Sequence, residues 1–246
     1  MATFVGFVLL KKATFDANKY IQDLKADWGL DADFEITHDG NTIITEECGA
    51  FLTASLMPAP IPNGEAVEAA RTNYRWDGAV AAAEQHQAHL LVSALSSKSI
   101  APTALAKQYV KLLASATHQD GCLGINILGT VMHPQMYYDF AKMYAENDDF
   151  PLENLVYIGL YADKNNTISG YTYGLDQFGK KELEIIESTE NPEEVYNFLQ
   201  SIADYVITSN VVLNDGETIG FSKDQKISIT VSAGMAVDGE TIKLGF

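Results

Sequence analysis

The sequence predicts an α+β protein with mixed or antiparallel sheets and packed helices. Apolar β-like runs alternate with amphipathic helical stretches along the chain, and Asp39-Gly40 separates two short runs rich in β-formers. Both residues of a DG pair tolerate the positive φ of a type I′ turn, so we expect an antiparallel hairpin there, which argues against a purely parallel sheet. No composition shift marks a linker. We therefore expect one domain over residues 1–246, built from duplicated ferredoxin-like halves, with 1–97 and 98–246 as the alternative division.

The first half of the chain combines β-like runs with a well-marked helix. Asp16 can cap a helix that runs to Trp28, with Tyr20 and Leu24 on its apolar stripe and Gly29 as its stop. The other expected elements are strands at 4–10, 34–37, 42–46, 50–57 and 88–95, a helical stretch capped by Asn63 that reaches about Gln85 with a break near 77–78, and a helix at 102–117.

The clearest helix signal stands in the second half, at Asn191-Pro192-Glu193-Glu194. It combines an N-cap, a proline at the first helical position and an N3 glutamate. The apolar residues that follow have helical spacing, so we expect Val195, Phe198, Leu199 and Ile202 to face the core. Weaker signals predict a strand near 125, a helix from 133 to the acidic residues 146–149, strands at 155–161, 182–185 and 227–232, and hairpin-like pieces DGETIGF (215–221) and DGETIKLGF (238–246).

The composition restricts the possible partners. A formal charge of −17, from 33 acidic and 16 basic side chains, opposes contact with nucleic acid or anionic membranes and favours a basic protein or a cation. Cys48 and Cys122 lie far apart without a CxxC or cysteine–histidine pattern, so we expect no disulfide, no structural metal and no cofactor. The apolar run Phe4–Leu10 has no basic segment before it and is closed by Lys11-Lys12, the reverse of a secretory signal, which favours a cytoplasmic location.

Two neighbouring features could form a binding site. The MPAPIP segment, Met57–Pro62, is stiffened by Pro58 and Pro60 and is either a binding loop or a rigid crossover from strand to helix. Arg71 and Arg75, the only arginines, stand four residues apart on one predicted helix beside Trp76. They could clamp a carboxylate or phosphate from one helix face, or pair internally with Glu68.

Two further motifs leave both a functional and a structural interpretation open. His86 and His89 form HxxH, which could hold a metal if helical but points to opposite faces if extended. Tyr173, Gly174, Phe178 and Gly179 belong to an aromatic and glycine-rich segment, which is either a recognition loop or a connection plugged by aromatics. The nucleophile and nucleotide motifs GxSxG, GxxxxGK[ST] and GxGxxG between strand and helix are absent.

Four segments in this order resemble the family known as domain of unknown function 4261. They are LMPAPIP (56–62), HLLVSAL (89–95), YTYGLDQFGKKELEI (171–185) and DGETIGF (215–221), and the likeness is densest from about Pro151 onward. The resemblance implies a mainly bacterial family over most of the chain. It implies no catalytic residues, cofactor or substrate.

These observations favour a non-catalytic binding or interaction module. The alternative is a small-molecule enzyme or sensor with an anion-binding pocket. If there is a ligand site, we expect it where the Met57–Pro62 loop, the Arg71/Arg75 helix face with His89, and the Tyr171–Gly179 loop meet. The expected partner is an unidentified protein or a small anionic ligand, and a homo-oligomer is also possible on this sequence.

Overall fold

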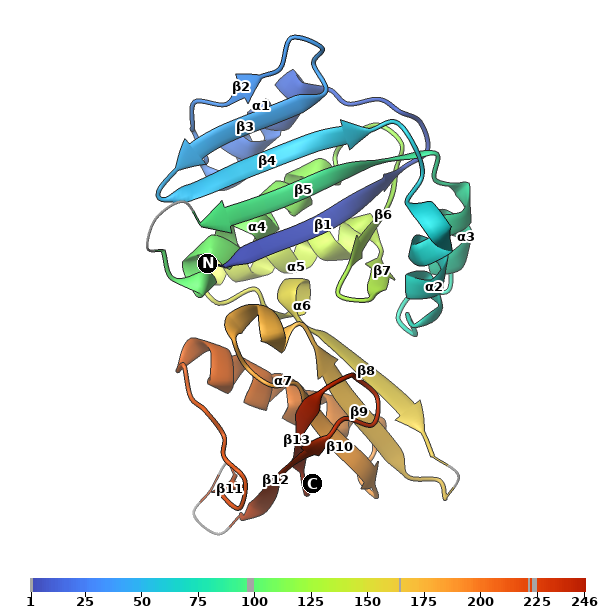
Figure 1. Cartoon of the computed structure of the whole chain (residues 1–246), viewed down its shortest axis with the longest axis vertical. Helices are drawn as coiled ribbons and strands as arrows, with labels where there is room; N and C mark the ends of the chain where they lie inside the picture. The colour runs from blue at the N-terminus through green and yellow to red at the C-terminus, as the bar shows by residue number, and fades with distance from the viewer. Residues whose placement is uncertain (1, 97–99, 164, 221, 223–224) are drawn as a thin grey trace. The chain divides into compact units, whose positions relative to one another are not determined.

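In the computed structural model, the chain divides into two units, residues 1–155 and residues 156–246. An antiparallel sheet is the framework of the first unit (Figure 1). The structure describes residues 2–96, 100–163, 165–220, 222 and 225–246. The alternative boundary between residues 97 and 98 and the last residue of DGETIGF, Phe221, lie outside these ranges. Helices accompany a mostly antiparallel sheet in both units, so the α+β class is confirmed, whereas the duplication stays a prediction.

The sheet of unit 1 has seven strands in the order β2-β3-β4-β5-β1-β6-β7, and all neighbours in it are antiparallel. The predicted hairpin at Asp39-Gly40 is confirmed, but its turn is wider than a two-residue type I′ turn. Gly40 has a positive φ of 73°, as such a turn requires, but Asp39 does not. The Asp39 side chain accepts a hydrogen bond from the Asn41 amide. The strands are β1 Thr3–Leu10, β2 Glu35–Ile36, β3 Thr42–Glu47, β4 Ala50–Met57, β5 Ala88–Ser96, β6 Cys122–Ile127 and β7 Thr130–Met132.

Three helices bury one face of this sheet: α1 (Ala17–Trp28), α4 (Pro102–Ala116) and α5 (Pro134–Asn147). Asp16 caps α1 by accepting from the Lys19 amide, and Gly29 ends it with a φ of 63°, as predicted. A side chain at Gly6 would collide with Tyr109 and Leu113 of α4, so glycine lets this helix approach β1 closely. Fully buried residues of this layer include Phe4, Val8, Leu10, Tyr20, Leu90, Val92, Leu105 and Leu112.

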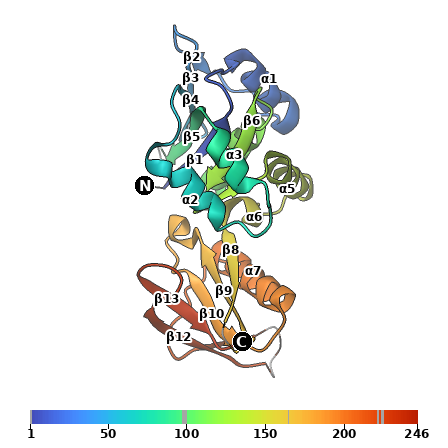
Figure 2. The same cartoon turned by 90° about the vertical axis from the view of Figure 1, so that its right-hand side faces the viewer.

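In the described part of the chain, the opposite face is covered at one end, over β6, β7 and the end of β1, by α2 (Glu65–Arg71) and α3 (Ala79–Gln85). Figure 2 shows α2 and α5 on opposite sides of the strands. Leu9, Ala70, Ala83 and Val131 form a small core beneath this helix pair. The predicted stretch from Asn63 to Gln85 is thus two short helices, because Asn63 has a φ of 56° inside the turn η1 (Pro62–Gly64) and α2 ends at Arg71. Unit 1 closes with α6 (Leu152–Leu155).

Unit 2 contains a six-stranded sheet in the order β11-β12-β13-β10-β9-β8 with α7 (Pro192–Thr208) on one face. Its sheet is antiparallel except for the β10–β13 pair. The sequence analysis missed β9, which takes up the first part of the segment predicted as an aromatic loop. The strands are β8 Tyr157–Ala162, β9 Ile168–Tyr173, β10 Leu183–Ser188, β11 Thr218–Ile219, β12 Ile227–Ala233 and β13 Glu240–Leu244, with the 3-10 turn η2 at Leu175–Phe178.

The helix α7 supplies the core of unit 2. Asn191 caps it by accepting from the Glu194 amide, and Val195, Phe198, Leu199 and Ile202 are buried, which confirms both predictions. Gly170 of β9 lies directly beneath: a Cβ there would stand 2.8 Å from the Leu199 side chain. No helix in the described part of the chain is long and apolar enough to cross a membrane.

We predict that Leu199→Ala lowers the free energy of unfolding of unit 2 by about 2–5 kcal/mol, because it removes a fully buried side chain and leaves a cavity. Tyr205→Ala on the same helix, where Tyr205 is 43% exposed, should cost less than about 1 kcal/mol. Urea titrations followed by circular dichroism measure both values. Equal losses for the two variants would contradict the assigned helix face.

Candidate functional site

Among the residues that the structure describes, no helix covers one face of a large part of the unit 1 sheet. In Figure 1, β3, β4, β5 and β1 turn this face toward the viewer, with α4 and α5 behind them. The strand register aligns its side chains in rows across the sheet. We call these residues the open face: the row Glu46, Phe51, Leu95 and Thr3, the row Glu35, Ile44, Thr53, Ser93 and Val5, and the row Thr42, Ser55 and Leu91. Phe7, the next member of the third row, packs against the core under α2 and α3.

The open face is more apolar than the solvent side of an antiparallel sheet usually is. Val5 is 46% exposed, Phe51 40% and Ile44 38%. Between them, the hydroxyls of Thr53 and Ser93 are hydrogen-bonded at 3.0 Å, which leaves them less free to bind water. A contiguous surface of this kind on a single chain commonly marks an interaction site.

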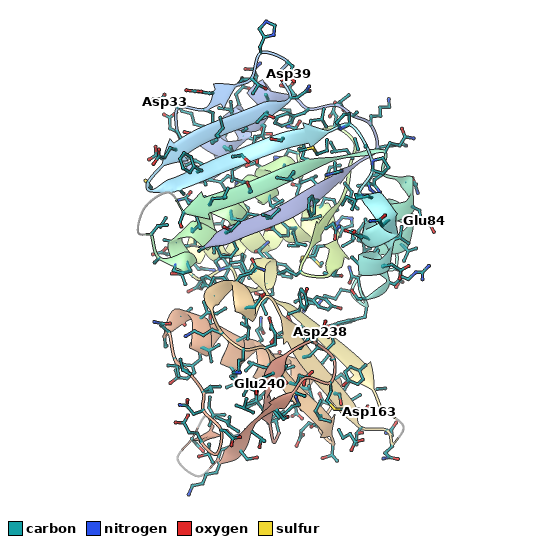
Figure 3. The ribbon with its side chains drawn as sticks, viewed as in Figure 1. Asp33, Asp39, Glu84, Asp163, Asp238 and Glu240 are labelled. Carbon is teal, nitrogen blue, oxygen red and sulfur yellow. The ribbon has the colours of Figure 1, made fainter. Side chains whose placement is uncertain are left out.

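Carboxylates border the open face at the edge formed by β2 and β3. Two of the rows begin at Glu35 or Glu46, directly beside Ile44 or Phe51. A hollow of about 320 Å³ lies here, lined by Asp33, Glu35, Glu46 and Glu47 together with the two apolar side chains. Figure 3 shows Asp33 beside these strands. The seven strands of this sheet contain no lysine or arginine, so the electrostatic potential at this edge is negative.

The proline loop Met57–Pro62 is held by the two histidines of the HxxH motif. His86 Nε2 accepts a hydrogen bond from the Ile61 amide at 2.8 Å, and His86 Nδ1 contacts the Ala83 carbonyl. His89 Nδ1 lies 2.9 Å from the Ala59 carbonyl oxygen. Because a carbonyl only accepts, Nδ1 carries the proton in both rings. Pro58 and Pro60 are exposed, on a loop whose backbone the two histidines hold in place.

The histidines therefore have structural partners. His86 ends α3 and His89 lies in β5, so neither the fully helical nor the fully extended geometry considered for HxxH applies. Burial lowers the pKa of His89, although its bond to the Ala59 carbonyl opposes the shift. Within the described ranges, no three His, Cys, Asp or Glu side chains are placed to hold a metal ion.

The two arginines do not share a helix face, contrary to the prediction. α2 ends at Arg71 because Thr72 and Asn73 turn toward β7: Asn73 Nδ2 donates to the Val131 carbonyl at 2.7 Å. Arg71 pairs with Glu68 at 3.3 Å, the internal alternative considered from the sequence, whereas the Arg75 guanidinium lies over the Tyr74 ring at 5.7 Å. Trp76 is half-buried in the core under α2 and α3, where it contacts His133 edge-on.

The other predicted site residues belong to unit 2. Tyr173 ends β9 and is 46% exposed, and Gly174, with a φ of 120°, leads into η2. Phe178 is half-buried, and Gly179 ends the turn in the left-handed region. The predicted common site thus has members in both units, and it stays a prediction.

Glu182 fixes this turn. Its Oε1 accepts from the amides of Gly174 and Leu175 at 2.8 Å each, and its Oε2 accepts from the Thr172 hydroxyl at 2.6 Å. Burial raises the pKa of Glu182, and the hydrogen bonds only partly oppose the shift. The segment predicted as a recognition loop is therefore a strand end and a short turn with a defined conformation.

Glu184, two residues further along β10, is fully buried. It accepts from the Ala236 amide at 2.7 Å and from the Thr241 hydroxyl at 2.8 Å, and it pairs with Lys243 Nζ at 2.5 Å. Burial alone would raise the pKa of this carboxyl, but these bonds, with Lys243 first, leave it below its ordinary value. With every partner in place, Glu184 holds the segment before β13 onto the sheet.

The family comparison bears on this second unit. Residues 171–245, from the end of β9 through β13, match the family profile described as "Domain of unknown function (DUF4261)". This stretch resembles the DUF4261 family. The resemblance predicted from the sequence is confirmed there, while the LMPAPIP and HLLVSAL segments lie outside the match. No curated protein and no solved structure matches the chain. Glu182, Glu184 and α7 all lie inside the matched stretch.

Sequence reasoning missed the open face and the two glutamates. Alternation in Glu182-Leu183-Glu184-Ile185 normally means that the glutamates face solvent. The acidic residues of β2 and β3 look like ordinary solvated positions too. One signal was available: β3 and β4 carry apolar residues on both faces, as Ile43 with Ile44 and Phe51 with Leu52 show.

We predict that His86→Phe releases the proline loop, because phenylalanine cannot accept the Ile61 amide. Hydrogen–deuterium exchange at Ile61 should accelerate by roughly tenfold or more. His38→Phe, at an exposed position in the β2–β3 turn, is the matched control and should leave the exchange rate unchanged. Unaltered exchange in His86→Phe would show that the histidine does not hold the loop.

We predict that Glu184 makes unit 2 sensitive to acid. Its pKa is lowered on folding, so its stabilisation is present above the unfolded value of about 4.3 and is lost as the pH falls through the folded pKa. Wild-type protein should therefore exceed Glu184→Gln in unfolding free energy at pH 7, and the difference should shrink toward pH 3. Glu187→Gln, exposed on the same strand, should keep the wild-type profile. A difference independent of pH would contradict this role.

Proposed function

We propose that unit 1 is a non-catalytic binding module whose open face receives an apolar and basic segment of a partner protein. The observation that carries this proposal is the row geometry: exposed apolar side chains in the middle of the sheet lead directly to carboxylates at its β2–β3 edge. A partner segment lying over the first two rows could bury apolar side chains on Val5 and Phe51 while its cationic groups reach Glu35 and Glu46.

The electrostatics of the whole chain support the same partner. A net charge of −17 attracts a basic protein over long distances and raises its association rate. The same field opposes binding of nucleic acid and of anionic membranes. We include in the proposal that the protein binds neither of them and that it is cytoplasmic. Apolar contact would then supply affinity, and the carboxylates would supply orientation and selectivity.

The alternative, an enzyme or sensor with an anion pocket at Arg71 and Arg75, has less support. Arg71 already pairs with Glu68, and the two guanidinium groups come from different local structures. Trp76, which could have formed an apolar wall beside them, is packed in the core with His133. The sheet face offers a larger surface with matched charge and apolar chemistry.

The proposal predicts binding of a labelled peptide with alternating leucine and lysine residues. Fluorescence anisotropy should show saturable binding that weakens with added salt, because part of the affinity is electrostatic. Val5→Lys places a cation in the centre of the open face and should weaken binding by at least about tenfold, a loss of about 1.4 kcal/mol. Met143→Lys is the matched control, since Met143 is 44% exposed on α5 across the sheet, and it should bind like the wild type.

Three outcomes would contradict this function. If a leucine–aspartate peptide bound as tightly as the leucine–lysine peptide, charge attraction would not contribute to binding. Equal weakening by Val5→Lys and Met143→Lys would show that added charge, not the face, matters. A dimer in sedimentation velocity that Val5→Lys abolishes would assign the face to a second copy of this chain instead.

A further inference from the structure

A small hollow lies between three helices on the side of the sheet opposite the open face. Its volume is about 120 Å³, and it is bounded by the end of α1, by α4 and by α5. The walls are mainly apolar and aromatic: Trp28 and Tyr144 face it together with Val110, Ala141 and Pro151. All of these residues belong to unit 1.

The aromatic wall is held in place before any ligand arrives. Trp28 Nε1 donates to Ser115 Oγ at 2.8 Å, the Lys142 ammonium lies 5.0 Å from the Trp28 ring centroid, and Tyr138 meets that ring edge-on at 5.8 Å. A wall with fixed rotamers loses little conformational entropy on binding.

Two lysines of α4 border the hollow, and their situations differ. Lys107 lies 3.3 Å from the Asp148 carboxylate and 3.3 Å from the Asp148 carbonyl oxygen. Lys111, one turn further, is half-buried, and neither a hydrogen bond nor an ion pair joins its ammonium to any residue that the structure describes. Burial, and then the charge of Lys107, lower the pKa of Lys111. A partly dehydrated cation without a counterion gains more from an anion than an exposed one does.

We propose that this hollow binds a small monocarboxylate with a compact apolar body, with its carboxylate on Lys111 and its apolar body against Trp28 and Tyr144. At about 120 Å³ the hollow is smaller than the apolar cavity of about 150 Å³ that a benzene molecule occupies, so it can enclose at most part of one six-membered ring. A single cationic contact suits one carboxylate, and the exposed Asp148 and Asp149 beside the mouth disfavour ligands with a second negative charge. This site is independent of the open face.

The test uses benzoate, with benzamide as its neutral isostere. Titration of the full chain to about 10 mM, the range expected for so small a ligand, should shift the NMR signals of the Trp28 indole and of the Tyr144 and Ala145 amides. Benzoate should bind at least tenfold more tightly than benzamide. Lys111→Met should remove this preference while leaving benzamide binding unchanged.

Two further variants separate the hollow from general surface effects. Ala145→Leu, at an exposed position on the wall, should fill the space and weaken both ligands. Lys25→Met removes an exposed cation of α1 that does not line the hollow, and it should leave benzoate affinity unchanged. The proposal is overturned if benzoate produces no saturable shifts, if the shifts centre elsewhere, or if Lys111→Met retains the preference for benzoate.

Discussion

The seven-stranded sheet of unit 1 can bury only as much of its surface as the chain has helices to cover. Its core face is closed by α1, α4 and α5, and Gly6 allows α4 to come into contact with the backbone of β1. On the other face, α2 and α3 cover β6, β7 and the end of β1 at Leu9 among the described residues. The exposed apolar rows, the acidic edge and the position of the proline loop all follow from this unequal coverage, because an antiparallel sheet places half of its side chains on each face.

Four polar side chains that are buried or half-buried fix loops and turns. In unit 1, His86 and His89 bind backbone groups of the Met57–Pro62 loop, and in unit 2, Glu182 and Glu184 bind amides at the turns on either side of β10. A buried polar group left without a partner is costly, so each such residue specifies one conformation of the segment that it meets. His86 and His89, considered as metal ligands from the sequence, therefore act here as anchors of the loop.

The two proposed binding regions of unit 1 suit opposite charges. The open face combines apolar side chains with carboxylates, whose charge has the same sign as the net charge of the chain. Long-range attraction therefore assists a basic partner. An anion that enters the hollow beside Lys111 must approach against the negative net charge, so its binding depends on contact with Lys111 at short range. This favours a small ligand over a large anionic one. Because the two lie on opposite sides of the sheet, a variant in one leaves the contacts of the other intact.

The sequence by itself determined the α+β class, most of the strands and the helix after Asn191, because caps, turn residues and apolar periodicity act over a few neighbouring residues. It also indicated the family that residues 171–245 resemble. The end of α2 at Arg71, the strand β9 and the burial of Glu184 were decided only by tertiary structure. In each case the partner is distant in sequence: Val131 for Asn73, Leu199 for Gly170, and Lys243 for Glu184. Local periodicity carries no information about such partners, and they determine which polar residues are buried and which apolar ones stay exposed.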